Sequence, residues 1–252
     1  MEERNFLSQY LILRSRDYGE GDKIVTMFSP ERGKESAIAK GAARSKSSLR
    51  GVVQPFSHVR LAIAKGRGSL HIVTQGEVIE SFAPLRQELE KITYASYLAE
   101  LVDAGMPERK PNADLFLLAL LTYSLLAYSE FSALTARYFE LRFLSCLGLT
   151  PRLDTCLKCG RSIQERRFFL SPFHGGIVCE TCAATMSSKV LIHAGTVQVL
   201  RFLQKSPAQK ILNLKMNPQT SEELKEALWC YLDYHLDYTL RARDILDQIE
   251  RS

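Results

Sequence analysis

The first 80 residues have the short alternating hydrophobic segments of a β domain. In residues 58–64, for example, Val59, Leu61 and Ile63 alternate with the polar His58 and Arg60. Five strands are predicted, at residues 10–15, 24–28, 35–39, 58–64 and 70–78. A small closed barrel pairs every edge of such a set, and the five-stranded OB-fold is the favoured arrangement. An SH3-like barrel is the alternative, because the pattern does not define strand order.

After Pro84 the hydrophobic period becomes helical. One helix is predicted up to Gly105, and Asn112 is expected to cap the next, which is apolar on all sides over residues 115–126 and should lie inside a bundle. Further helices are predicted at residues 132–146, at 195–204 and after Thr220, where Thr220 and Glu223 form a capping-box pattern. Residues 241–252 are interpreted as a frayed, charged end.

Four cysteines form two Cys-x-x-Cys pairs, at Cys156 and Cys159 and at Cys179 and Cys182. This spacing lets two thiolates reach one ion from a tight turn, and two such pairs predict a four-cysteine zinc site. Because all four positions are thiolates, none is left open for water, and one structural Zn²⁺ ion is expected. The alternatives are two redox pairs or four free thiols, or a site in which the nearby His174 replaces one cysteine. The intervening residues predict a small hairpin that turns at Gly175 and Gly176.

Charge is distributed unevenly along the chain. Residues 32–67 contain nine lysines and arginines and one acid, Glu35, for a net charge of +8, whereas residues 221–252 have a net charge of −4. A cationic segment on a small barrel favours a polyanionic partner. The predicted nucleic-acid-binding residues are Lys34, Lys40, Arg44, Lys46, Arg50, Lys65 and Arg67. Residues 41–51 space three of these cations with small residues and are interpreted as a mobile or phosphate-facing loop outside the core.

Catalytic motifs are missing from the sequence. There is no Gly-x-x-x-x-Gly-Lys-Ser/Thr phosphate loop, no His-Glu-x-x-His and no Gly-x-Ser-x-Gly. The prediction is therefore a protein that is not an enzyme and has no small-molecule substrate. No apolar run approaches the ~20 residues of a membrane span, and the acidic N-terminus is unlike a signal peptide. A soluble, cytoplasmic protein without a membrane partner is expected.

Two motifs together resemble the RecO family of recombination mediators. The first is the run from Lys40 to Gly51 followed by Gln54-Pro55-Phe56, and the second is Gly175-Gly176-x-x-Cys179-x-x-Cys182 after Cys156-x-x-Cys159-Gly160. The order of barrel, helices and zinc ribbon matches over essentially the whole chain. The four cysteines are not universal in that family, so they mark its zinc-bearing branch.

The resemblance implies an OB-fold and a non-catalytic role in bacterial DNA repair, at the nucleoid. Such proteins bind single- and double-stranded DNA and anneal complementary strands. With RecR they help to load RecA onto strands coated by single-strand-binding protein (SSB), whose C-terminal tail they contact. The expected fold is α+β, with an OB-fold domain at residues 1–80 and a helical domain at 81–252 that is interrupted by the zinc ribbon at about 152–185.

Two other classes of function stay open. One is an RNA-processing factor or enzyme that uses the zinc ribbon, and the other is an adaptor whose basic patch meets an acidic protein. The helical part is expected to receive protein partners, because it has more large apolar side chains than a small bundle buries. Those side chains are Phe116, Phe131, Tyr138, Phe139, Phe143 and Trp229.

Overall fold

The computed structural model describes residues 5–66, 70–130, 132–162, 167–186, 189–236 and 238–251. It contains two compact units. The first comprises Met1–Ser132 and Leu240–Ser252, and the second comprises Ala133–Thr239. The sequence-based domain boundaries, at residues 80 and about 152–185, remain predictions.

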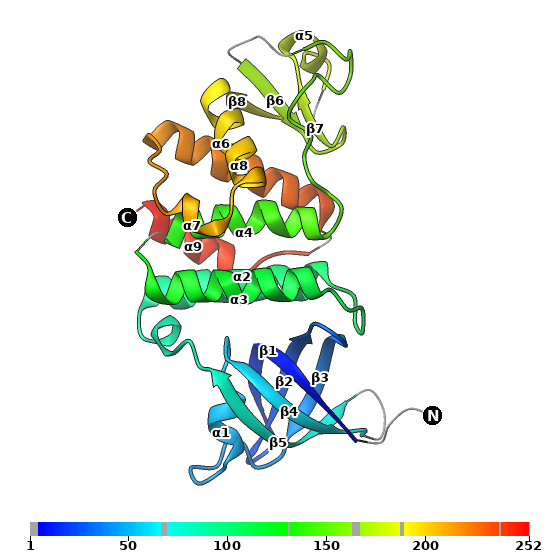
Figure 1. Cartoon of the computed structure of the whole chain (residues 1–252), viewed down its shortest axis with the longest axis vertical. Helices are drawn as coiled ribbons and strands as arrows, with labels where there is room; N and C mark the ends of the chain where they lie inside the picture. Colours follow the sequence, from blue (N-terminus) through cyan, green and yellow to red (C-terminus); the bar gives the residue numbers. More distant parts are fainter. Residues whose placement is uncertain are drawn as a thin grey trace. The chain divides into compact units, whose positions relative to one another are not determined.

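A closed five-stranded barrel occupies the first part of unit 1 (Figure 1). Its strands are β1 (Asn5–Tyr18), β2 (Asp22–Ser29), β3 (Gly33–Ala39), β4 (His58–Ala64) and β5 (His71–Glu80). The strand order is β1-β2-β3-β5-β4, and closure depends on two pairings, β1 with β4 and the parallel β3 with β5. The predicted OB-fold barrel is confirmed. As expected from the alternation, Val59, Leu61 and Ile63 point into the core.

The segment between β3 and β4 differs from its prediction as a loop outside the core. It contains a short helix, α1 (Leu49–Val52), and Ala42, Leu49, Val52 and Val53 are buried in the same cluster as the barrel strands. Leu49, Val52 and Val53 have the i, i+3, i+4 spacing of one helix face, and together with Ala42 they pack in the barrel core. The segment therefore has an apolar inner side and a cationic outer side.

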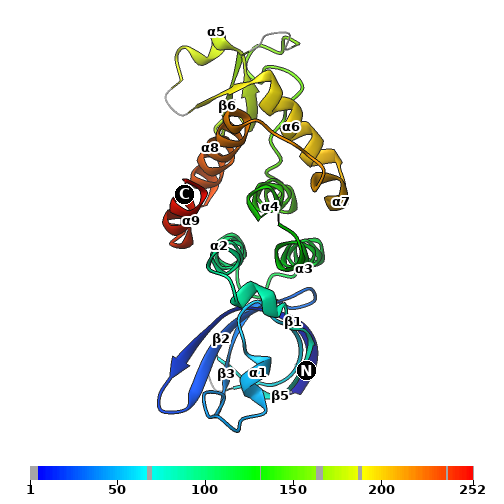
Figure 2. The ribbon, with the colours of Figure 1, turned by 90° about the vertical axis from the view of Figure 1, so that its left-hand side faces the viewer.

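Three helices complete unit 1: α2 (Leu89–Gly105), α3 (Ala113–Tyr128) and α9 (Ala242–Arg251), with a short 3-10 turn, η1 (Ala83–Arg86), before α2. Figure 2 shows α2 and α3 end-on beside the barrel. As predicted, Asn112 caps α3 by accepting a 3.0 Å hydrogen bond from the Leu115 N–H. The prediction that α3 is buried on all sides is wrong, because Leu117 is 62% exposed.

The chain end is a helix rather than a frayed segment. Helix α9 packs along α2, where Leu246 is fully buried and the Ala242 N–H donates to Glu100 Oε2 at 2.9 Å. Tyr94 in α2 also donates to Glu250 in α9. The charges that suggested fraying lie on the outer side of an amphipathic helix whose apolar side is covered.

Unit 2 contains helices and a three-stranded sheet with strand order β7-β6-β8. Its elements are α4 (Ser132–Cys146), β6 (Arg167–Ser171), β7 (Gly176–Val178), α5 (Glu180–Ala183), β8 (Val190–His193), α6 (Ala194–Lys205), α7 (Ala208–Ile211) and α8 (Pro218–His235).

The start of α8 differs from the predicted capping box. Asn217 is the N-cap and accepts a hydrogen bond from the Thr220 N–H at 2.8 Å. Glu223 instead accepts hydrogen bonds from the His193 backbone N–H at 3.0 Å and from the Thr196 hydroxyl at 2.5 Å. The carboxylate therefore stabilises the first turn of α6, where unpaired N–H groups favour an anion.

The large side chains expected to form a partner surface are mostly core residues. Phe116, Tyr138, Phe139 and Phe143 are at most 3% exposed, and Trp229 is 8% exposed; Phe131 lies outside the described residues. The Trp229 indole N–H donates to Glu140, which also forms a 3.1 Å ion pair with Arg137. Phe116 packs in unit 1 against Phe28 and His58, and the other rings lie in unit 2, where Arg137 and Glu140 form the buried ion pair.

Candidate metal centre and nucleic-acid interface

Each Cys-x-x-Cys pair is a knuckle, a tight turn that carries two thiols. The four cysteines of the two knuckles converge on one point. The Sγ atoms of Cys156, Cys159, Cys179 and Cys182 all lie within 4.8 Å of one another, and Cys159 Sγ is 3.9 Å from Cys179 Sγ. A disulfide needs sulfur atoms about 2.05 Å apart, so these thiols are not bonded to each other. A tetrahedral ion with Zn–S distances of about 2.3 Å places its sulfur ligands roughly 3.8 Å apart, close to the spacing found.

Local backbone geometry positions the first knuckle. Gly160 follows Cys159 with φ of +73°, a conformation that glycine adopts without strain, and its N–H donates to the Cys156 carbonyl at 2.8 Å. The turn brings the two thiols of the pair to the same side.

The thiols differ in how readily they ionise. Burial disfavours the Cys156 thiolate, but N–H groups of Cys179, Cys159 and Lys158 outweigh this effect and lower the pKa of Cys156 to about 6. Burial raises the pKa of Cys179, and the hydrogen bond that the Cys182 thiol makes with Cys179 raises the pKa of Cys182 to about 12. The Cys156 thiolate therefore forms easily, whereas the thiols of Cys179 and Cys182 resist ionisation without a cation beside them. This donor set suits a closed, four-thiolate metal site.

His174 is not part of this cluster of described metal-ligand residues. Its Nδ1 atom is 2.9 Å from the Ser171 hydroxyl, in the turn between β6 and β7. The alternative in which a histidine replaces one cysteine is therefore not supported by the geometry.

The cationic segment that follows β3 is exposed at residues 43–46 and is held against the β1–β2 turn. The Gly41 N–H donates to Asp22 Oδ1 at 2.8 Å, and the Ala43 N–H donates to the Gly21 carbonyl at 3.0 Å. Four cations lie on the outer side of the loop: Lys40, Arg44, Lys46 and Arg50. Across the described ranges, none of these four has an ion-pair partner. This group is called the basic loop below.

The other predicted cations have different surroundings. Lys34 is only 15% exposed and forms a 3.0 Å ion pair with Asp103 of α2. Lys65 is exposed at the end of β4, and Arg67 lies outside the described residues. The structure therefore brings Lys40, Arg44, Lys46 and Arg50 together and assigns Lys34 a contact within unit 1.

Sequence reasoning missed a second row of side chains on the barrel. Arg14, Arg16 and Tyr18 are exposed on β1, and their partners on β2 are Thr26, Ile24 and Asp22. Arg14 and Arg16 line a cleft of about 260 Å³ with residues of β2 and β3 and with the acids Asp103 and Glu108, and Arg14 forms an ion pair with Asp103. Their i, i+2 spacing, which places side chains on one face of a strand, was the signal that could have identified them.

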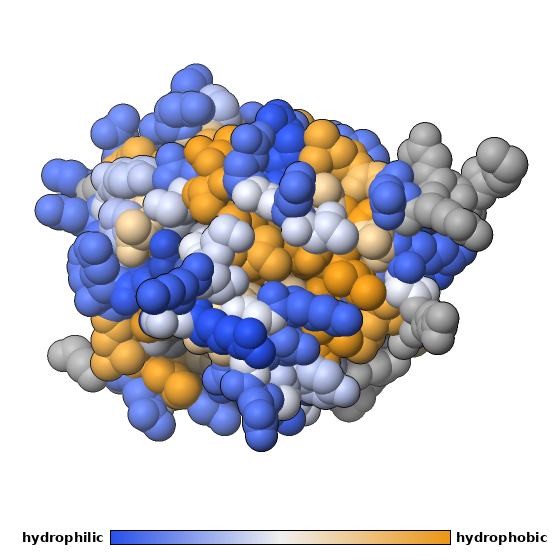
Figure 3. Space-filling model, turned by 90° about the horizontal axis from the view of Figure 1, so that it is seen from below, coloured by the Kyte–Doolittle hydropathy of each residue, from blue (hydrophilic) through white to orange (hydrophobic). Residues whose placement is uncertain are grey.

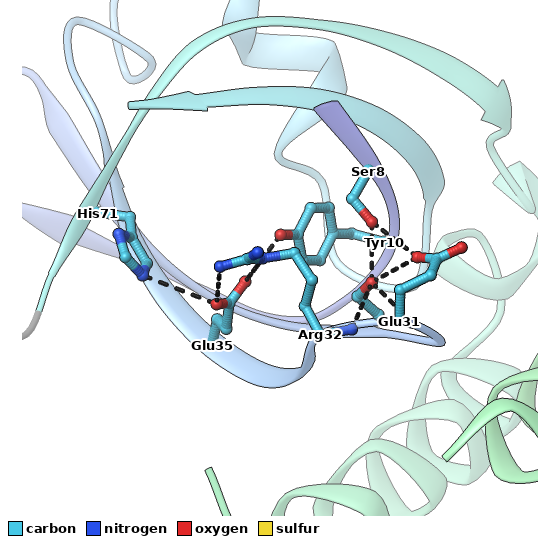
Figure 4. A network of polar contacts seen from close by, with 7 residues as sticks. Ser8, Tyr10, Glu31, Arg32, Glu35 and His71 are labelled. Carbon is cyan, nitrogen blue, oxygen red and sulfur yellow. Dashed lines mark hydrogen bonds and ion pairs between the residues drawn. The ribbon is translucent and has the colours of Figure 1, made fainter. Parts of the chain in front are cut away.

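An acidic residue inside the basic segment is neutralised in the barrel. Figure 4 shows Glu35 facing Tyr10, Arg32 and His71. Glu35 accepts hydrogen bonds from Tyr10 at 2.7 Å and from Arg32 at 3.0 and 3.1 Å, and the Arg32 guanidinium covers the Phe6 ring at 3.5 Å. The charge of Glu35 therefore does not compete with the basic loop for a polyanion.

The outer surface of the barrel also exposes apolar side chains. Figure 3 shows an apolar patch surrounded by hydrophilic residues on the face seen from below. Among barrel residues, Leu7 is 66% exposed, and Val78 and Ile79 are each 43% exposed. Charged and apolar groups thus both lie on the outer surface of the barrel.

Comparison with known proteins assigns the chain to a family. Residues 1–82 match "Recombination protein O N terminal", and residues 86–244 match "Recombination protein O C terminal". The chain belongs to the RecO family of DNA repair proteins. The DNA repair protein RecO of Pelotomaculum thermopropionicum is 41% identical over 94% of this chain and 92% of the relative. Those of Desulforamulus reducens and Moorella thermoacetica are 35% and 36% identical, over 96% and 97% of this chain and 94% and 91% of the relatives.

Membership in the RecO family agrees with the arrangement of the chain. The two matched regions meet between residues 82 and 86, next to η1 and after the last barrel strand. None of the helices in the described part of the chain has the length and hydrophobicity needed to cross a bilayer.

Proposed function

We propose that the chain is a non-catalytic recombination mediator. It binds single- and double-stranded DNA with little sequence preference, anneals complementary strands and, with RecR, helps to load RecA onto SSB-coated strands. The observation that carries this proposal is the basic loop, four exposed cations on an OB-fold barrel in a RecO-family chain. Cations that meet phosphates supply affinity for any sequence, which suits annealing.

The path of a strand over the barrel follows from the side chains available. The basic loop adjoins the β1–β2 turn, and Arg16 and Tyr18 lie on β1 just before that turn. Phosphates would contact the cations, and a base would stack on Tyr18, which is 52% exposed. Lys65 and Arg67 remain predicted contacts at the β4–β5 hairpin.

The metal centre is proposed to hold one structural Zn²⁺ ion. Cys156, Cys159, Cys179 and Cys182 would supply all four ligands and leave no position for water or substrate. The ion would join the first knuckle to the hairpin of β6 and β7. The zinc ribbon would then contribute to folding and to the positioning of surface side chains rather than to catalysis.

Protein partners are proposed to bind through the helices rather than the barrel. The SSB tail is acidic and ends in an aromatic residue, so its site needs apolar surface. Leu117 and Leu121 of α3 are 62% and 36% exposed and supply such surface. These two leucines, rather than the large side chains that the structure buries, form the proposed partner surface.

The basic loop can be tested by changing Arg44 and Lys46 together to alanine. Each phosphate contact contributes roughly 0.7 to the slope of log K against log salt on single strands, so the slope should flatten by about 1.4. Binding of all sequences should weaken alike, and annealing should slow. The measurement is fluorescence anisotropy with labelled oligonucleotides at several salt concentrations.

A matched control removes the same charge elsewhere. Lys210 and Lys215 are exposed in unit 2 and can be changed together to alanine. This variant should keep the wild-type slope. If both double variants change the slope equally, net charge rather than the basic loop governs binding and the assignment is wrong.

A further inference from the structure

The turn between β6 and β7 presents an aromatic ring that the proposed barrel site does not use. Phe173 is 72% exposed, the most exposed aromatic side chain of the described residues. Its ring meets His174 edge-on at a centroid distance of 5.0 Å, and His174 is itself held by the Ser171 hydroxyl at 2.9 Å. The ring is therefore supported from one side while its remaining surface faces solvent.

The backbone around Phe173 is held in place by the segment before the first knuckle. The Arg152 N–H donates to the Gly175 carbonyl at 2.9 Å, and the Ile177 N–H donates to the Arg152 carbonyl at 3.0 Å. A Cβ atom at Gly176 would lie 2.1 Å from the Arg152 carbonyl oxygen, so only glycine permits this approach. The turn is thus positioned before any ligand arrives, which lowers the entropy lost on binding.

The same contacts place a cation beside the turn. Arg152 forms a β-bridge with Gly176, and its side chain is exposed. The nearest acid in the sequence, Asp154, is 3.9 Å from the Arg201 guanidinium. Residues 151–193 contain six lysines and arginines against three acids. This excess of cations in the sequence would favour a polyanion.

Further rings connect to the turn through α8. The hydroxyl of Tyr231 would lie 3.9 Å from a Cβ at Gly175, and the Tyr231 ring is 4.7 Å from that of His235. His235 in turn meets Tyr234, which is 47% exposed. Tyr231 thus approaches the backbone of the turn, and Tyr234 is a second exposed ring on the same helix.

We propose that the β6–β7 turn is a second contact site for single-stranded nucleic acid, in which Phe173 stacks on a base and Arg152 contacts a phosphate. An exposed ring with a neighbouring cation is the combination by which proteins hold unpaired bases without reading their sequence. The inference rests on the proposed DNA-binding function and adds a site in unit 2. Paired bases are unavailable for stacking, so this site selects single strands.

A fluorescent substitution tests the contact at the site itself. The sequence contains one tryptophan, Trp229, which is only 8% exposed, so Phe173→Trp places a reporter where none exists. In the full-length chain, an oligothymidine should quench the new emission. An abasic strand of equal length, which has the same phosphates and no bases, should bind without quenching it. Duplex DNA should also leave the emission unchanged.

Binding measurements complete the test. Phe173→Ala should weaken oligothymidine binding about fivefold or more, the low end for one stacked base, and leave the salt slope unchanged. Phe173→Leu should behave like Phe173→Ala if the π-face matters, whereas a purely apolar docking site would tolerate leucine. Arg152→Gln should flatten the salt slope by roughly 0.7. Zinc content and melting temperature should match wild type in all three variants.

The outcomes separate this inference from the proposed function. If Phe173→Trp is not quenched while the chain still binds oligothymidine through the basic loop, the second site is wrong and the barrel assignment stands. Quenching by the abasic strand would also contradict stacking. If wild type binds no oligonucleotide at low salt, both proposals fail.

Discussion

The hydroxyl of Tyr10 donates a 2.7 Å hydrogen bond to Oε2 of Glu35, and both side chains are buried in the barrel. Burial and the adjacent carboxylate raise the pKa of Tyr10, so the phenol remains protonated and remains a donor. The same carboxylate binds Arg32 through both oxygens. This arrangement satisfies a buried charge inside the barrel domain.

Removing this donor should destabilise the barrel. Tyr10→Phe keeps the ring but leaves Glu35 with fewer hydrogen bonds, and the free energy of unfolding should fall by about 1–2 kcal/mol. Urea denaturation measures the change. Tyr18→Phe is the control, because Tyr18 is half exposed and its hydroxyl can bond to water, so the effect should stay within about 0.5 kcal/mol. Equal losses in the two variants would contradict the role of Glu35.

Stability should fall on acidification because of His71. Burial lowers the pKa of His71, although Glu35 at 3.7 Å opposes this effect. The folded state therefore binds the proton less readily than the unfolded state. The contribution to stability is complete above the unfolded pKa of about 6.5 and is lost as pH falls below it.

The measurement is the free energy of unfolding between pH 7.5 and 5. His71→Gln should reduce the slope in that interval, and part of the slope should persist because burial also lowers the pKa of His58 and of His235. A slope that is unchanged in His71→Gln would show that His71 does not contribute.

Loss of one knuckle thiol should release the metal. Cys159→Ser leaves three thiolates, and the melting temperature should decrease together with the zinc content, because ligation of such a site is coupled to folding. Elemental analysis and calorimetry give the two values. Cys230→Ser, outside the cluster, should retain the ion. Freshly purified wild-type protein without zinc would overturn the assignment.

The exposed row on β1 should contribute to binding of single strands. Tyr18→Ala should weaken binding by about 1–3 kcal/mol if one base stacks there, with little change in salt slope, whereas Arg16→Gln should flatten the slope by roughly 0.7. Anisotropy titrations with oligothymidine separate the two effects. Leu7→Ala, which changes another exposed barrel side chain on β1, serves as the control. Wild-type affinity in Tyr18→Ala would exclude stacking at this ring.

Local sequence determined the elements and the metal centre. Alternation over residues 58–64 predicted β4, Asn112 predicted the start of α3, and the two Cys-x-x-Cys pairs predicted the sulfur cluster. In each case the physical information lies within a few neighbouring residues: side-chain direction along a strand, an oxygen that accepts from an N–H three positions later, or two thiols on one turn.

Only the tertiary structure decided which charged and apolar side chains remain available at the surface. Lys34 pairs with Asp103, 69 residues away, and α9 covers α2 although its own sequence resembles a frayed end. Leu117 is exposed in a helix that is apolar on every side, and Glu223 stabilises α6 rather than its own helix. Whether a charge is paired or a helix face is covered depends on segments that are distant in the chain. The local hydrophobic period does not show which of these segments contact each other.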